Sequence, residues 1–152
     1  MGKTALLPKR FNANIANITM RKIEHIGIAV KDLEKSNELF AKLLGKGHFK
    51  TEMVEGEKVN TSFFQVGETK VELLQATHEN SPIAKYLEKK SEGVHHIAFD
   101  VEDILAEVER LKGEGFEILN ETPKLGADNK LVVFLHPRST NGVLIELCQD
   151  RQ

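Results

Sequence analysis

The stretch His25-Ile26-Gly27-Ile28-Ala29-Val30-Lys31-Asp32-Leu33 returns in the second half of the chain as His96-Ile97-Ala98-Phe99-Asp100-Val101-Glu102-Asp103-Ile104. In both stretches a histidine begins an apolar run, which is typical of a buried strand. An aspartate follows each run, and apolar residues at helical spacing come after it. Each stretch therefore predicts a strand that starts with a histidine and leads into a helix.

A second pair of similar stretches lies further along. Val71-Glu72-Leu73-Leu74-Gln75 returns as Ile145-Glu146-Leu147-Cys148-Gln149, at nearly the same offset. A loop insertion explains the small difference between the two offsets. Turn residues between short apolar runs add strands over 61–66, 70–74, 131–135 and 143–147, and a short helix is expected over 82–89. The chain thus consists of two βαβββ halves, about 20–90 and 91–152, which must pack together as one α+β domain at 20–152 because neither can bury a large core.

Composition excludes several classes of protein. The 152 residues carry a formal charge of −2, which argues against nucleic acid as a partner. No apolar run approaches the roughly 20 residues that span a bilayer, so we expect no membrane contact. A single cysteine, Cys148, excludes an intrachain disulfide and a cysteine zinc cage, whereas the six histidines suit a metal held by imidazole and carboxylate.

The segment 1–19 differs from the rest of the chain. It contains Lys3, Lys9 and Arg10 but no acidic residue, as organellar transit peptides do. A disordered extension or a true start at Met20 are the alternatives. We expect a cytoplasmic protein, or one of the mitochondrial matrix if this leader is a transit peptide.

Four polar residues recur at matching positions of the two halves. A single glutamate on a strand is usually solvated, and a single histidine is usually a core or surface residue. The recurrence in pairs favours a shared role, because a two-fold arrangement of the halves would bring two imidazoles and two carboxylates into one central cleft. Such a set suits a divalent ion. The residues are His25, Glu72, His96 and Glu146. His95 precedes His96 and is expected to point to the opposite face of its strand.

These features resemble the vicinal oxygen chelate (glyoxalase-like) superfamily, and within it most closely the methylmalonyl-CoA epimerases. The resemblance spans about residues 21–149. The segments that carry it are His25-Ile-Gly-Ile-Ala-Val, Lys70-Val-Glu-Leu-Leu, Ser81-Pro-Ile-Ala-Lys-Tyr-Leu, Gly93-Val-His-His-Ile-Ala, Pro123-Lys-Leu-Gly-Ala, Phe134-Leu-His-Pro-Arg-Ser and Gly142-Val-Leu-Ile-Glu-Leu.

The resemblance implies a mixed, curved sheet around a metal cleft. It also implies interconversion of (2R)- and (2S)-methylmalonyl-CoA, by removal of the C2 proton through a metal-stabilised enolate. The implied ligands are His25, Glu72, His96 and Glu146, and Glu146 is the implied acid/base on one face of C2. The metal would be Co²⁺ or Mn²⁺, with Ni²⁺, Zn²⁺, Mg²⁺ and Fe²⁺ as alternatives. The implied partners are an acyl-CoA substrate and a second copy of the chain in a homodimer.

Basic residues near the last pair of strands could meet the phosphates of CoA. These are Lys124, Lys130 and Arg138, with Gly126 and Ser139 as candidate contacts for the acyl part. Solvated surface charge is the alternative for the three cations.

The second acid/base residue is harder to place. Some bacterial members carry a second glutamate where Thr61 stands here, and Glu55 and Glu57 lie on a nearby loop. A metal-bound water or Glu72 could serve instead.

Other functions occur on the same scaffold. A glyoxalase-type isomerase or an extradiol dioxygenase would also use histidine and glutamate ligands. A protein that sequesters small molecules would need neither metal nor catalysis, and a dimerisation module would need no site.

Overall fold

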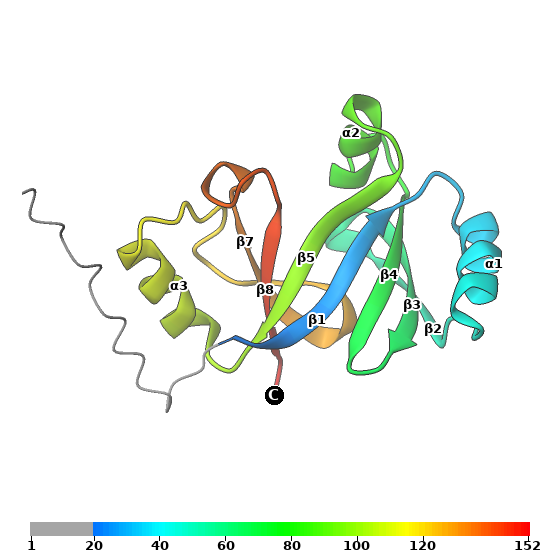
Figure 1. Cartoon of the computed structure of the whole chain (residues 1–152). Coiled ribbons are helices and arrows are strands. Elements are labelled where there is room, and N and C mark those ends of the chain that lie inside the picture. The colour runs from blue at the N-terminus through cyan, green and yellow to red at the C-terminus, as the bar shows by residue number, and fades with distance from the viewer. Residues whose placement is uncertain (1–19) are drawn as a thin grey trace, which may run out of the picture.

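The structure is a computed structural model that describes residues 20–152, so the expected leader lies outside the described part of the chain. Figure 1 shows the arrangement of the elements. The strands are β1 (Met20–Ala29), β2 (Lys50–Val54), β3 (Val59–Val66), β4 (Thr69–Ala76), β5 (Gly93–Val101), β6 (Lys124–Leu125), β7 (Lys130–Leu135) and β8 (Ile145–Asp150). The helices are α1 (Leu33–Leu44), α2 (Pro82–Lys89) and α3 (Ile104–Gly113), with short 3-10 turns η2 (Glu55–Glu57), η3 (Ala127–Asn129) and η4 (Pro137–Ser139).

All the strands form one mixed sheet in the order β2-β3-β4-β1-β5-β8-β7-β6. The two histidine strands, β1 and β5, lie at its centre and pair antiparallel, and each pairs parallel with the glutamate strand of its own half. From the centre towards either edge, the strands follow in the same succession: the histidine strand, the glutamate strand and then the two remaining strands of that half. The expected α+β fold with a mixed, curved sheet is confirmed (Figure 1).

Both repeated stretches contribute to helix capping. The carboxylates of Asp32 and Asp103 accept hydrogen bonds of 3.0 Å from the backbone N–H three residues further on. The amide oxygens of Gln75 and Gln149 accept from the first N–H of α1 and α3, at 2.6 and 2.8 Å. The glutamine that ends each glutamate strand therefore joins that strand to the helix of its own half, which explains why it recurs.

Strand alternation separates the core from the site. In β4, Val71 and Leu73 pack beneath α1, while Glu72 between them points to the opposite face and lines a pocket. In β8, Leu147 packs beneath α3 and Glu146 lines the same pocket. Helices α1 and α3 thus cover the apolar face of the sheet, both carboxylates are directed into the other face, and α2 packs on that other face beside the pocket.

The structure differs from the expectation in three details. The two histidine strands begin before their histidines, at Met20 and Gly93. The second strand of the second half is β6, which has only 2 residues. The last strand starts at Ile145 rather than at residue 143, because η4 and a turn at Gly142, whose φ is 85°, occupy the preceding segment. Within residues 20–152, none of the helices is long and apolar enough to cross a bilayer.

Candidate metal centre and active site

The register of the central strands brings the four repeated residues together. His96 faces Gly27 across β1 and β5, and His25 faces the residue two positions after His96. Glu72 on β4 lies beside Gly27, and Glu146 on β8 lies beside the residue that faces His25. Each half therefore contributes one histidine and one glutamate to the middle of the sheet.

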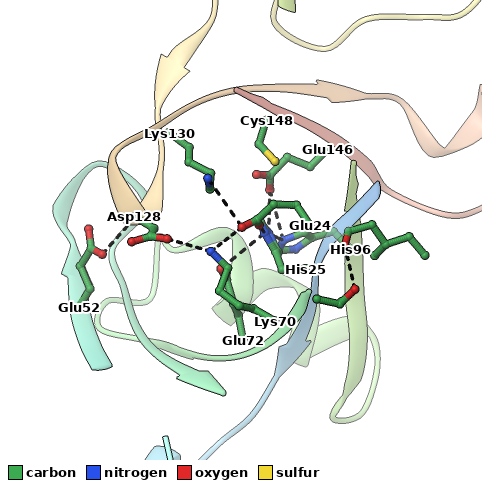
Figure 2. A network of polar contacts seen from close by, with 12 residues as sticks. Glu24, His25, Glu52, Lys70, Glu72, His96, Asp128, Lys130, Glu146 and Cys148 are labelled. Carbon is green, nitrogen blue, oxygen red and sulfur yellow. Dashed lines mark hydrogen bonds and ion pairs between the residues drawn. The ribbon is translucent and has the colours of Figure 1, made fainter. Parts of the chain in front are cut away.

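The four side chains are buried, and each lies close to at least one other of the set (Figure 2). The Nε2 atoms of His25 and His96 are 3.0 Å apart. An oxygen of Glu146 lies 3.2 Å from Nε2 of His96 and 3.7 Å from Nε2 of His25. A carboxylate oxygen of Glu72 lies 3.5 Å from Nδ1 of His25.

This donor set fits a divalent ion. Divalent metals bind imidazole nitrogen and carboxylate oxygen at about 2.0–2.2 Å, so neighbouring ligand atoms around one ion lie about 3–3.5 Å apart. The separations of 3.0 and 3.2 Å at His96 Nε2 fall in this range. Ligand atoms of His25, Glu72 and His96 also lie within 4.8 Å of one another. The residues present could hold a metal with nitrogen and oxygen ligands.

Burial and mutual charge shift the pKa values of these groups in different directions. Burial raises the pKa of Glu72 to about 7, and the nearby charge of Glu146 adds to this effect. Burial would also raise the pKa of Glu146, but His25 and His96 outweigh it, so this pKa is lowered. Burial lowers the pKa of His96 to about 3. At neutral pH, Glu146 is therefore an ionised carboxylate and His96 a neutral imidazole.

Sequence reasoning missed Glu24, which is buried directly before His25. Its carboxylate accepts a hydrogen bond from Nδ1 of His25 and pairs with the ammonium of Lys70. Burial would raise the pKa of Glu24, but His25 and Lys70 outweigh it and lower the pKa to about 2. The β1–β5 register skips Glu24 between Ile23 and His25, so a bulge brings this side chain to the site. An acidic residue next to the histidine was the only signal, and strict alternation would have placed it on the other face.

The expectation that His95 points away from the site is wrong. His95 and His96 line the same pocket, and their Nδ1 atoms are 3.0 Å apart. The register between Gly27 and Ile28 skips His95, so a second bulge cancels the alternation. Burial lowers the pKa of His95 to about 4, which leaves it neutral at pH 7.

Residues 24–134 match the model of the glyoxalase/bleomycin resistance protein/dioxygenase superfamily. The chain belongs to this superfamily. The ethylmalonyl-CoA/methylmalonyl-CoA epimerase of Cereibacter sphaeroides is 42% identical over 130 residues, which is 84% of this chain and 97% of that protein. The mitochondrial methylmalonyl-CoA epimerase of Dictyostelium discoideum is 40% identical over 88% of this chain and 81% of that protein.

Solved structures share the fold of this chain and part of its sequence. A variant of the Streptomyces coelicolor methylmalonyl-CoA epimerase, in complex with 2-nitronate-propionyl-CoA, superposes with a TM-score of 0.83 at 34% identity. The match covers 87% of this chain and 96% of that one.

In this superfamily member the four ligand candidates form one wall of a pocket with about 600 Å³ of empty space, part of it open to solvent. Thr61, at the position of the missing second glutamate, is buried and lines the pocket. Among the described residues, three carboxylates line it, namely those of Glu57, Glu72 and Glu146. The remaining lining is mainly apolar, as in pockets that bind organic ligands.

The predicted substrate contacts occupy different environments. Gly126 lines the pocket. Lys124 lies at its rim, where Nζ is 2.5 Å from a carboxylate oxygen of Glu57 and 5.4 Å from the ring centroid of Phe134. Lys130 is buried and pairs with Asp150 instead of lining the pocket.

The other two predicted contacts lie in η4. Arg138 is exposed and donates to the carboxylate of Glu117 at 2.7 Å. The hydroxyl of Ser139 accepts from the backbone N–H of Glu117 at 2.9 Å. Neither residue lines the pocket. Their contacts with Glu117 instead tie η4 to the segment that precedes β6. Their role in substrate binding stays a prediction.

Proposed function

We propose that this protein is a divalent-metal-dependent epimerase that interconverts (2R)- and (2S)-methylmalonyl-CoA. The observation that carries the proposal is the convergence of two imidazoles and two carboxylates, one of each from either half, in the wall of a largely apolar pocket. Two relatives, whose matches extend over most of this chain and most of their own length, are methylmalonyl-CoA epimerases and support the same substrate.

The ion would be held by His25, Glu72, His96 and Glu146, with Co²⁺ or Mn²⁺ as the proposed metals. When bound, it would supply Lewis-acid stabilisation of negative charge on the thioester oxygen. The pocket would enclose the acyl group beside this wall. The thioester acidifies the C2 proton, and a bound ion would offset the negative charge of the substrate carboxylate, so a positioned carboxylate can serve as base.

Glu146 is the proposed acid/base for one face of C2. It lines the pocket, and although burial opposes ionisation, His25 lowers the pKa of Glu146 and keeps its carboxylate ionised at neutral pH. For the opposite face we propose Glu72, which is buried and lines the same pocket, with a metal-bound water as an alternative. Glu57 is a further alternative, although its carboxylate is engaged by Lys124.

Binding of the CoA part is assigned to the basic rim of the pocket. Lys124 is available there, because its pairing with Glu57 lies at a partly exposed position from which an anionic phosphate could displace it. We further propose that the protein acts as a homodimer, which light scattering would test.

The deciding experiment follows exchange of the C2 proton of methylmalonyl-CoA in deuterium oxide by NMR. The protein is first stripped with a chelator and then assayed with and without Co²⁺ or Mn²⁺. We expect exchange and loss of chirality only with metal, and no turnover of the methylglyoxal–glutathione hemithioacetal. Exchange that is equally fast in the stripped protein would refute metal dependence, and turnover of the hemithioacetal alone would refute the substrate.

A further inference from the structure

Each ligand histidine is contacted by the residue directly before it. Glu24 accepts from Nδ1 of His25, and Nδ1 of His95 lies 3.0 Å from Nδ1 of His96. Glu24 and His95 therefore occupy equivalent positions of the repeat, as His25 and His96 do. Both lie at the points where the β1–β5 register skips a residue. The repeat thus contains a bulged residue whose side chain turns back onto the next side chain.

This arrangement determines which nitrogen each ring presents. An imidazole that binds an ion is neutral and carries one proton, so a contact that holds this proton on Nδ1 leaves the lone pair on Nε2 for the ion. The Nε2 atoms of His25 and His96 face one another and Glu146. Partners of this kind fix the tautomer and the orientation of metal-binding histidines in general.

We propose that Glu24 and His95 are positioning residues that hold Nε2 of His25 and of His96 in the ligand orientation. This inference rests on the metal centre proposed above. The two partners are not alike, because Glu24 offers an anionic acceptor and His95 a neutral one. His25 therefore becomes the stronger donor to the ion.

The charge of Glu24 is itself held in place. Lys70 pairs with it, and Nζ of Lys130 lies 3.7 Å from it. Lys70 also donates to Asp128 of η3 at 2.8 Å, so the contacts continue from one half of the molecule into the other (Figure 2). Because Glu24, Lys70 and Lys130 are all buried, the carboxylate has no solvated alternative position.

His95 is held by packing. Its ring meets the ring of Tyr86 edge-on, with centroids 5.0 Å apart, and the hydroxyl of Tyr86 donates to the carbonyl of Val94 at 2.9 Å. Helix α2 thus supports the side chain that contacts His96.

The first test compares Glu24→Leu, Glu24→Gln and Asp150→Asn. Glutamine keeps an oxygen that can accept from Nδ1 of His25, whereas leucine keeps none. Asp150 is exposed and pairs with Lys130, the lysine that also lies near Glu24, but no contact between Asp150 and His25 is found. Asp150→Asn is therefore the matched control. The readouts are the Co²⁺ dissociation constant at pH 7, measured by competition with a chelating dye, and the visible absorption of bound Co²⁺. Thermal melts check that each variant is folded.

We expect Glu24→Leu to weaken Co²⁺ binding by about 10- to 100-fold and to alter its absorption spectrum. Glu24→Gln should lose less, and Asp150→Asn should match the wild type. Wild-type affinity and spectrum in both Glu24 variants would overturn the assignment. If Glu24→Leu does not fold, Glu24→Gln decides, with an unchanged dissociation constant counting against the proposal.

The second test reads the tautomers directly. Long-range ¹⁵N–¹H NMR of the Zn²⁺-loaded protein should place the protons of His25 and His96 on Nδ1. His95→Leu should disturb the signals of His96 and leave those of His25 in place, and Glu24→Gln should do the reverse. Protons on Nε2 in the wild type would overturn the inference. If the wild type binds neither Co²⁺ nor Zn²⁺, the metal centre itself fails, which is a different result from equal binding by wild type and variants.

Discussion

A Cβ atom on Gly27 would overlap the ring of His96, lying 2.6 Å from its Nδ1 and 2.7 Å from its Nε2. The ring of His96 therefore lies directly against the backbone of β1, and glycine is the residue that leaves room for it. The equivalent position of the second half is Ala98, which faces His25 and whose methyl group is accommodated in the core. The two halves of the site are thus similar but not identical.

Substitution of Gly27 by alanine should displace His96. We expect Gly27→Ala to lower the free energy of unfolding by about 1–3 kcal/mol, as overpacking does, and to weaken Co²⁺ binding by at least about tenfold. Ala98→Gly is the control and should retain Co²⁺ affinity. Denaturant melts and metal titrations provide the two measurements, and a Gly27→Ala protein with wild-type affinity would contradict the packing.

Removal of the proposed base should slow proton exchange. Glu146→Gln keeps the shape of the side chain but cannot take a proton, so exchange at C2 should fall by about 100-fold or more, even at metal concentrations that saturate the variant. Full exchange by this variant would exclude Glu146 as acid/base.

Glu72→Gln should separate stability from metal binding. Folding raises the pKa of Glu72 from its usual 4.5 to about 7, so the folded state holds this proton more tightly. The free-energy cost of ionising Glu72 in the folded state therefore grows between pH 4.5 and about pH 7 and is constant at higher pH. In the presence of a chelator, we expect Glu72→Gln to match the wild type at pH 4 and to be about 1–3 kcal/mol more stable at pH 8.

Chemical denaturation at several pH values measures this difference. If Glu72→Gln is no more stable than the wild type at pH 8, ionisation of Glu72 does not destabilise the folded state, which contradicts the prediction. Its Co²⁺ affinity should nevertheless be lower than that of the wild type, because a neutral amide replaces the anionic ligand that we propose.

Lys124 should affect substrate binding more than chemistry. If Lys124 receives a phosphate of CoA, Lys124→Met should raise KM by about tenfold and leave kcat nearly unchanged. Lys112 on α3 is a suitable control, since it pairs with Glu109 and Glu121 outside the pocket. Steady-state kinetics at two salt concentrations would measure the effect, and equal KM values for the Lys112 and Lys124 variants would contradict it.

Much of the fold was predictable because the sequence repeats. A histidine that opens an apolar strand and a glutamate between apolar residues recur at nearly constant offsets, and strand alternation then directs both into one face. The same repeat predicted Glu72 and Glu146 as neighbours of the histidines. Gln75 and Gln149 were visible as repeated residues, but their capping role needed the structure.

The residues that alternation misplaces could not be predicted. Glu24 and His95 lie at bulges, and neither the amino-acid type nor the spacing indicates where a strand skips a partner. Lys130 looked like a candidate phosphate contact because it lies near a loop, yet its ammonium turns inward to Asp150 and Glu24. Such positions depend on contacts between segments far apart in the chain.

Because the two halves of the chain meet at the antiparallel pair of β1 and β5, the site could be assembled from two separate fragments. A chain cut between α2 and β5 would yield two fragments, one with His25 and Glu72 and the other with His96 and Glu146. Neither fragment contains all four proposed ligands, so we expect tight metal binding to require their reassociation. Complementation of the two fragments should therefore become stronger as the concentration of the divalent ion rises.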